Sequence, residues 1–191
     1  MKKLLIVLAC LAATLMVRGQ GTMDVGNMTT GPNGSVDAPI YDLVVGGTKL
    51  AGSGYLAQVY AGPTAGSLTA VMATPAPFYS AASGGAGYYN PGANYLLPVT
   101  GVAAGGTAFV QVVAWEAAAG TFVQAQASST FKWGQSSTFS IALGGSGSPP
   151  SLPSAMVGLT SFAIAAHVVP EPSTMALGLL GAATLLLRRR K

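Results

Sequence analysis

The sequence predicts an all-β protein, with a single antiparallel β-sandwich domain between an N-terminal signal peptide and a short C-terminal transmembrane helix. Short runs of β-prone residues alternate with turns rich in glycine, which accounts for 26 of the 191 residues. No part of the body shows a long apolar period of 3.6 residues with caps at its ends, which argues against long helices. Charged residues make up only 7% of the chain, which argues against a disordered segment of the charged type.

The N-terminus has the features of a cleaved signal peptide. Lys2 and Lys3 precede an apolar stretch of fourteen residues, and small residues follow it. A helix of that length spans about 21 Å and falls short of the ~30 Å hydrocarbon core. We therefore predict a signal peptide over residues 1–21, cut after Gly19 or Gly21, with an uncleaved anchor as the alternative.

Composition divides the rest of the chain into further segments. Residues 22–40 contain many turn residues and little periodicity, so we expect an irregular lead-in there. The β-sandwich body is predicted over 41–143. A linker rich in Gly, Ser and Pro follows at 144–158, and residues 159–169 are expected to form a last strand and a stalk.

Seven runs in the body have the composition of strands. They combine β-branched, aromatic or other apolar residues with turn residues near their ends. Pro98 places one of these runs at a sheet edge or a strand end, because proline cannot donate a ladder hydrogen bond. The predicted strands are 41–45, 55–60, 68–72, 95–99, 107–117, 121–127 and 139–143.

The run 107–117 is the strongest strand candidate. Its alternate positions are apolar on both sides, with Trp115 on one side and Val112 on the other. A strand with two apolar faces is typical of a central position that is covered on both sides. We expect this strand to form a hairpin with 121–127.

The C-terminus combines three features in a fixed order. Pro170, Glu171 and Pro172 come first, and Pro172 blocks a helix from continuing through it. An apolar run of thirteen residues follows, which gives a helix of about 20 Å and is marginal for a stable span. Basic residues close the chain and favour a cytoplasmic end. The membrane segment includes Met175, Leu177, Leu179, Leu180, Leu185, Leu186 and Leu187, and the basic stop is Arg188, Arg189, Arg190 and Lys191.

This arrangement, over about residues 168–191, resembles the PEP-CTERM sorting signal, which is also known as the ice-binding-protein C-terminal domain. The resemblance implies that an exosortase recognises the Pro-Glu-Pro sequence at the start of 170–191 and cleaves nearby. It further implies transient anchoring in the inner membrane and delivery to the envelope surface or the extracellular matrix. A plain membrane anchor is the alternative. Family members carry very different bodies, so the tail predicts a destination and leaves the activity open.

The charge of the body argues against nucleic acid as a partner. Residues 22–169 contain two lysines and four carboxylates, a net charge of −2. Nucleic-acid binding requires clustered Lys and Arg that neutralise phosphates. Cys10, the only cysteine, lies in the apolar N-terminal stretch, so the body can form neither a disulfide nor a cysteine zinc site. A lipoprotein signal at Cys10 is the weaker alternative to a cleaved signal peptide.

No catalytic, cofactor-binding or metal site is predicted in the body. General acid–base catalysis needs titratable groups in a pocket, and His167, the only histidine, lies beside the membrane segment. Glu116 next to Trp115 is the one pair that suggests a sugar site, but a core tryptophan followed by a glutamate that ends the strand facing solvent explains it better. Asp37 and Asp42 do not have the spacing of a standard calcium loop.

Aromatic residues in the glycine-rich loop 80–93 offer a second way to contact sugars. Tyr88 and Tyr89 could stack on a sugar ring or pack down onto the body, and we expect packing.

These patterns together predict a non-enzymatic structural or interaction protein of the bacterial cell surface or extracellular matrix. A carbohydrate-binding module for exopolysaccharide is the second candidate, and a secreted hydrolase is the third. The expected partners are the Sec translocon, signal peptidase, an exosortase and the inner membrane, with exopolysaccharide as a candidate ligand. No cofactor is expected.

Overall fold

The computed structural model describes residues 19–32, 34–93, 95–146 and 149–167. Over these residues the chain is all-β with very little helix, as the sequence predicts. The helical segments are η1 (Ala81–Ser83), η2 (Ala117–Ala119) and α2 (Phe122–Gln126). The strands are β1 (Gln20–Asp24), β2 (Met28–Gly31), β3 (Gly34–Asp37), β4 (Tyr41–Asp42), β5 (Tyr55–Gly62), β6 (Thr69–Ala70), β7 (Ala76–Pro77), β8 (Leu96–Ala103), β9 (Thr107–Glu116), β10 (Lys132–Gln135), β11 (Phe139–Ala142) and β12 (Ala163–Ala166).

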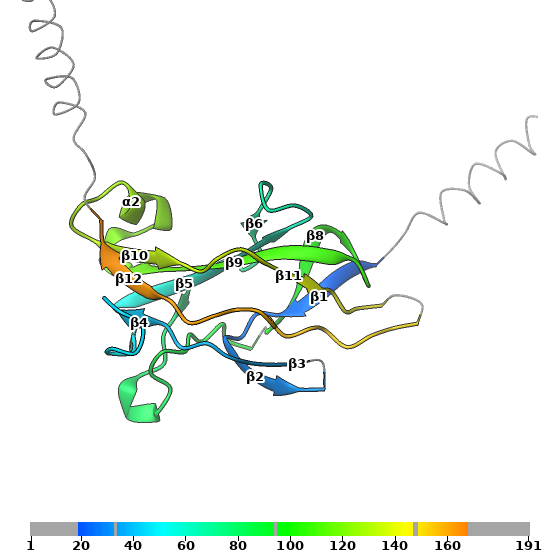
Figure 1. The fold of residues 1–191 in the computed structure, drawn as a ribbon, viewed down its shortest axis with the longest axis horizontal. Helices are drawn as coiled ribbons and strands as arrows, with labels where there is room; N and C mark the ends of the chain where they lie inside the picture. The colour runs from blue at the N-terminus through cyan, green and yellow to red at the C-terminus, as the bar shows by residue number, and fades with distance from the viewer. Residues whose placement is uncertain (1–18, 33, 94, 147–148, 168–191) are drawn as a thin grey trace, which may run out of the picture.

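The largest sheet is built around the antiparallel pair β5 and β9. These strands pair from Tyr55 opposite Glu116 to Gly62 opposite Phe109. The strand order across the sheet is β4-β12-β10-β9-β5-β6, with β11 also paired to β9 and β7 to β5 (Figure 1). The edge strand β4 runs parallel to β12, whereas the other neighbours in this sheet are antiparallel.

Two smaller antiparallel sheets complete the fold. β1 pairs with β8, and β2 forms a hairpin with β3. In Figure 1, β9 to β11 lie along one side of the molecule and the β2–β3 hairpin lies along the other. One hydrophobic cluster joins these parts, because it contains Met23 and Val36 from the small sheets together with Val112 and Ile164 from the large one.

β9 is buried on both faces, which confirms the prediction of a central strand. On one face Val110, Val112 and Ala114 belong to the main cluster. On the other face Val113 and Trp115 belong to a second cluster, which also contains side chains of α2. The short helix therefore covers the face of β9 that the main core leaves free.

The segment 121–127 was predicted as a strand, and this prediction was wrong. Residues Phe122–Gln126 form α2, which starts with a capping box. The Thr121 hydroxyl accepts a hydrogen bond from the Gln124 amide at 3.2 Å, and the Gln124 side chain accepts one from the Thr121 amide at 2.9 Å. This reciprocal cap satisfies two amides that the first helical turn leaves free, and it favours helix over the β propensity of Phe122 and Val123.

The segment 22–40 is more regular than the irregular lead-in that we predicted. It holds most of β1 and the complete β2–β3 hairpin, and Met23 and Ile40 are fully buried. The strands are too short for their periodicity to stand out among the turn residues. β7 and β10 were missed for the same reason.

The segment 144–158, predicted as a linker, packs onto the body over its described residues. Gly145 and Ser151 form a β-bridge, and Ala155 and Met156 are buried. The predicted last strand is confirmed as β12, within 159–169.

Two other predicted strands are much shorter in the structure. The run 41–45 yields only β4, because Leu43 adopts a left-handed backbone conformation and ends it. In the run 68–72, only Thr69 and Ala70 form a strand, β6.

Candidate functional site

A pocket lined by four tyrosines is the most distinctive concave feature of the described residues. It has a volume of about 190 Å³, and Gly26, Asn27 and Met28 complete its lining. The glycine-rich loop 80–93 supplies Tyr88 and Tyr89, and Tyr79 and Tyr95 flank it on either side. We call it the tyrosine pocket.

Backbone hydrogen bonds fold the glycine-rich loop onto the body. The Tyr79 amide donates to the Tyr88 carbonyl at 3.0 Å, and the Gly87 amide donates to the Leu50 carbonyl at 2.7 Å. Gly87 has a φ of +91°, and a Cβ there would lie 2.7 Å from Pro39 Cβ. Glycine is therefore required at this position both for its backbone conformation and for the close approach of the two segments.

Asn27 joins three segments beneath the pocket. Its side chain is only 1% exposed. Its Nδ2 donates to the carbonyls of Ala38 at 2.9 Å and Gly87 at 3.0 Å, and its Oδ1 accepts from the Tyr89 amide at 3.2 Å. With all three contacts internal, Asn27 has a structural role.

Tyr89 is packed into the core, as the sequence predicts. It is 2% exposed, and its hydroxyl donates to the Val25 carbonyl at 2.5 Å. Its ring meets Phe78 edge to face, with 6.2 Å between centroids. Burial, with a smaller contribution from the charge of Asp24, raises the pKa of Tyr89 above its ordinary value, so the phenol stays protonated.

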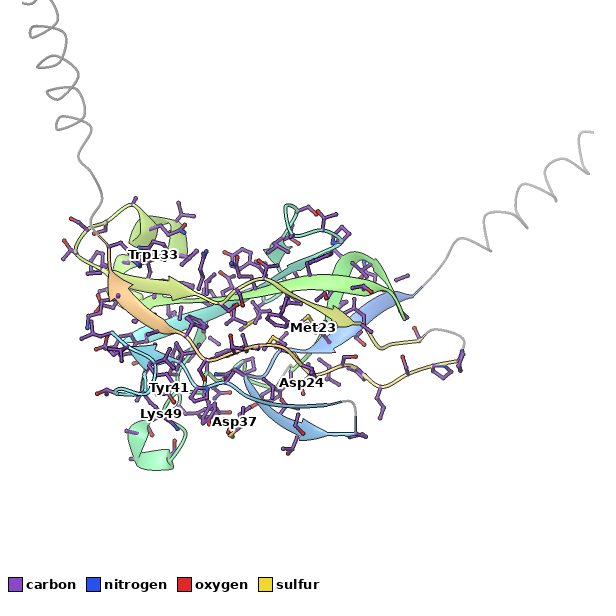
Figure 2. The ribbon with its side chains drawn as sticks, in the orientation of Figure 1. Met23, Asp24, Asp37, Tyr41, Lys49 and Trp133 are labelled. Carbon is purple, nitrogen blue, oxygen red and sulfur yellow. The ribbon has the colours of Figure 1, made fainter. Side chains whose placement is uncertain are left out.

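Tyr88 is also packed, which confirms the second half of that prediction. Its hydroxyl donates to Asp37 Oδ1 at 2.6 Å, and Lys49 Nζ lies 5.4 Å from the centre of its ring. In Figure 2, Asp37 and Lys49 lie on the side of the molecule away from Trp133. The hydrogen bond to Asp37, then burial and the negative charge of Asp37, raise the pKa of Tyr88 to about 12.

Because of Tyr88, the stability of the protein is expected to change with pH in the alkaline range. Because its pKa is higher in the folded state than the ordinary 10.0, the folded state holds the proton more tightly. The stabilisation from this group is complete below about pH 10 and disappears as the pH rises through about 12. We expect the difference in urea midpoint between the parent protein and Tyr88→Phe to shrink over this interval. Parallel midpoint curves would contradict this assignment.

Tyr79 and Tyr95 form the accessible rim of the pocket. Their hydroxyls lie 2.9 Å apart in an exposed hydrogen bond, and Tyr95 is 37% exposed. This hydrogen bond, together with burial, raises the pKa of Tyr79. The exposed Met28 side chain lies beside them in the lining. The rim thus offers aromatic surface next to two hydroxyls, which can contact the apolar faces and the hydroxyls of a neutral ligand.

The carboxylates that the sequence singles out have separate internal partners. Both oxygens of Asp42 accept from Lys132 Nζ at 2.9 Å, and that lysine's pKa is raised chiefly by this hydrogen bond. Glu116 Oε2 accepts from the Lys132 amide at 3.1 Å, while Asp37 bonds Tyr88. Asp37 and Asp42 therefore do not share a site. Within the described ranges, no group of three or more His, Cys, Asp or Glu side chains is placed to hold a metal ion.

Trp115 and His167, which the sequence analysis considered for a sugar site and for catalysis, both make contacts that hold the fold together. Trp115 is fully buried, as predicted, and its indole N–H donates to the Gly120 carbonyl at 3.2 Å. His167 stacks on Trp133, with 4.1 Å between ring centroids, and its Nε2 lies 3.2 Å from the Trp133 carbonyl oxygen. This stack holds the last described residue of the chain against β10.

The predicted processing signals lie mostly outside the described residues. This applies to most of the predicted signal peptide and to the whole of 170–191, with its sorting motif, membrane segment and basic stop. Of the two predicted cleavage positions, Gly19 immediately precedes β1, while Gly21 lies within it and is buried. None of the helices in the part of the chain that is described has the length and apolar character needed to cross a membrane.

Sequence comparison identifies one segment of the chain. Residues 168–191 match the PEP-CTERM protein-sorting motif, which confirms the resemblance carried by the Pro-Glu-Pro sequence, the apolar run and the basic end. No curated protein and no solved structure matches the chain. The protein thus carries at its C-terminus a PEP-CTERM motif, which implies export, association with the cell envelope and processing by an exosortase.

Proposed function

We propose that this protein is a structural or interaction protein of the bacterial cell surface or extracellular matrix, without catalytic activity of its own. The sorting motif at 168–191 is the observation that carries the proposal, because this motif directs a passenger domain to the envelope. The Sec translocon and signal peptidase would act at the N-terminus, and the inner membrane would hold the C-terminus until exosortase cleavage. The contacts of the body agree with a passive role.

Those contacts use titratable side chains to hold the fold together. Asp42 pairs with Lys132, Asp37 accepts from Tyr88, and His167 stacks on Trp133. A catalytic acid or base must be free to exchange a proton with a substrate in a pocket. We also propose that the body is a two-layer β-sandwich, since the main hydrophobic cluster joins the large sheet to β1 and β3.

Intact mass of the exported protein tests the processing part of this proposal. We expect a mass that lacks both ends, with the N-terminal cut after Gly19, because that position leaves β1 whole. As the matched control, a variant with Pro170, Glu171 and Pro172 all changed to Ala should remain in the membrane fraction with its tail intact. Recovery of the parent chain in the cytosol with the mass of residues 1–191 would refute the proposal.

Carbohydrate binding is the second candidate function, and the rim of the tyrosine pocket is the observation that favours it. Tyr79 and Tyr95 present aromatic faces and hydroxyls at the surface, which suits a neutral sugar better than the packed Tyr88 and Tyr89.

The rim can be tested without disturbing the pocket floor. We expect a Tyr79→Ala, Tyr95→Ala double variant to lose retention on an exopolysaccharide column, because the substitutions remove the two rings that form the rim. Val123→Ala, on the exposed side of α2, should be retained like the parent chain. Equal retention of the double variant and the parent would exclude this pocket as the sugar site.

A further inference from the structure

The turn after β4 exposes three consecutive aliphatic side chains. Leu43, Val44 and Val45 are 60%, 60% and 56% exposed. Turns of this kind ordinarily carry Gly, Asn, Asp, Ser or Pro at their surface. We call these three residues the apolar tip.

The exposure of the apolar tip is fixed by the backbone. The turn is closed by hydrogen bonds from the Asp42 amide to the Thr48 carbonyl at 2.7 Å and from the Gly47 amide to the Val44 carbonyl at 3.0 Å. The Leu43 amide donates to the Ile164 carbonyl of β12 at 2.8 Å. Leu43 has a φ of +64°, and it is the only non-glycine residue with positive φ among those described. Leu43 thus adopts an unfavourable backbone conformation that its own hydrogen bond to β12 and the two hydrogen bonds of the turn keep in place.

The apolar tip lies where the chain leaves the body for its sorting motif. β4 and β12 are parallel, with Tyr41 opposite Ala163 and Asp42 opposite Ile164, so both strands point toward the same end of the molecule (Figure 1). Seven residues separate His167 from the start of the apolar run at Met175. Even fully extended, seven residues span at most about 25 Å. A chain held in a membrane by that run therefore keeps this end of the body close to the lipid surface.

The charges around the apolar tip are compatible with an anionic membrane. Asp42, the carboxylate next to the tip, is paired through both oxygens with Lys132. Lys49 lies on the other side of the turn, opposite Tyr41 in a β-bridge, and is exposed. Basic groups beside an apolar surface attract anionic headgroups while the aliphatic side chains enter the interfacial layer.

We propose that the apolar tip inserts into the membrane interface while the uncleaved C-terminal segment holds the chain there. The partner of this surface is a lipid bilayer, and the proposal rests on the membrane stage of the proposed function. Insertion gives the body a second point of attachment and so fixes its orientation while the Pro-Glu-Pro sequence awaits cleavage. A single myristoyl chain binds membranes only marginally, and the three side chains carry fewer carbons than that chain. The apolar tip alone therefore binds too weakly to hold the body on the membrane, and the body is released once the tail is removed.

Fluorescence quenching on the full chain in vesicles tests this proposal. In a Cys10→Ala background, a single cysteine introduced as Val44→Cys carries an environment-sensitive fluorophore. The vesicles contain phosphatidylethanolamine and phosphatidylglycerol, with or without acyl chains that carry bromine. We expect quenching by the brominated lipid and a several-fold loss of quenching by aqueous iodide. The matched control is Leu152→Cys, which is equally exposed but lies in the loop before β12, away from the apolar tip.

Two further variants distinguish a failure of tip insertion from a failure of membrane anchoring by the C-terminal run. A label at Ala176→Cys reports whether the C-terminal run enters the bilayer. If it is quenched by brominated lipid while the labels at positions 44 and 152 remain equally accessible to iodide, the tip proposal is wrong and membrane anchoring stands. If the label at 176 stays in water, both proposals fail. Adding Val45→Asp to the Val44→Cys chain should restore iodide quenching with an unchanged circular dichroism spectrum, and persistent protection would overturn the role of the tip.

Discussion

Replacing Trp115 with alanine is expected to lower the free energy of unfolding by about 3–5 kcal/mol, the range measured for large aromatic residues removed from a core. The side chain is fully buried and packs on Phe122 of α2, with 5.7 Å between ring centroids. Its loss also removes the hydrogen bond to the Gly120 carbonyl, which holds the turn before α2. Urea unfolding followed by far-ultraviolet circular dichroism measures the effect.

The matched control for this substitution lies on the same short helix. Val123 is 70% exposed, and Val123→Ala should change the free energy of unfolding by less than about 0.5 kcal/mol. Since α2 covers one face of β9, the Trp115→Ala protein should also show a weaker near-ultraviolet signal from the second cluster. If the two variants unfold at the same urea concentration, α2 does not cover a core.

The second large loss of stability is expected for Gly134→Ala in β10. Gly134 lies between β9 and β12, and a Cβ at this position would collide with the backbone carbonyl of Ala163. A backbone atom cannot rotate away as a side chain can, so β12 must move and pull Ile164 out of the core. Overpacking of this kind lowers the free energy of unfolding by about 1–3 kcal/mol and sometimes more.

A glycine in open space provides the comparison for Gly134. A Cβ at Gly66 would meet no heavy atom within 4 Å, so Gly66→Ala should leave the urea midpoint nearly unchanged. Amide exchange should accelerate in β12 and β4 for Gly134→Ala alone, because β4 in this sheet pairs only with β12. Equal exchange in the two variants would show that β12 tolerates the methyl group.

The sequence predicted those elements whose signal is local and strong. β9 was recognised because both its faces are apolar over ten residues, and β5 because glycines and Pro63 bound an unbroken β-prone run. The sorting motif is a linear pattern that needs no fold to be recognised. Packing of Tyr88 and Tyr89 could also be predicted, since large aromatic side chains gain more from burial than from exposure.

Other features depend on contacts that no local pattern reveals. β4 and β12 are separated by more than a hundred residues, and neither has a period long enough to predict their parallel pairing. The pairing of the Tyr79 and Tyr95 hydroxyls likewise required the folded loop. The helix α2 was different, because Thr121 and Gln124 have the spacing of a capping box and could have indicated a helix start.

The interior position of β12 determines when the body can finish folding. Of the described strands it is the last to be synthesised, yet it lies between β4 and β10 and contributes Ile164 to the main cluster. Until residue 166 emerges, β4 has no partner in this sheet and one edge of β10 is open. A chain that crosses a membrane N-terminus first therefore cannot complete the large sheet until residue 166 has been translocated.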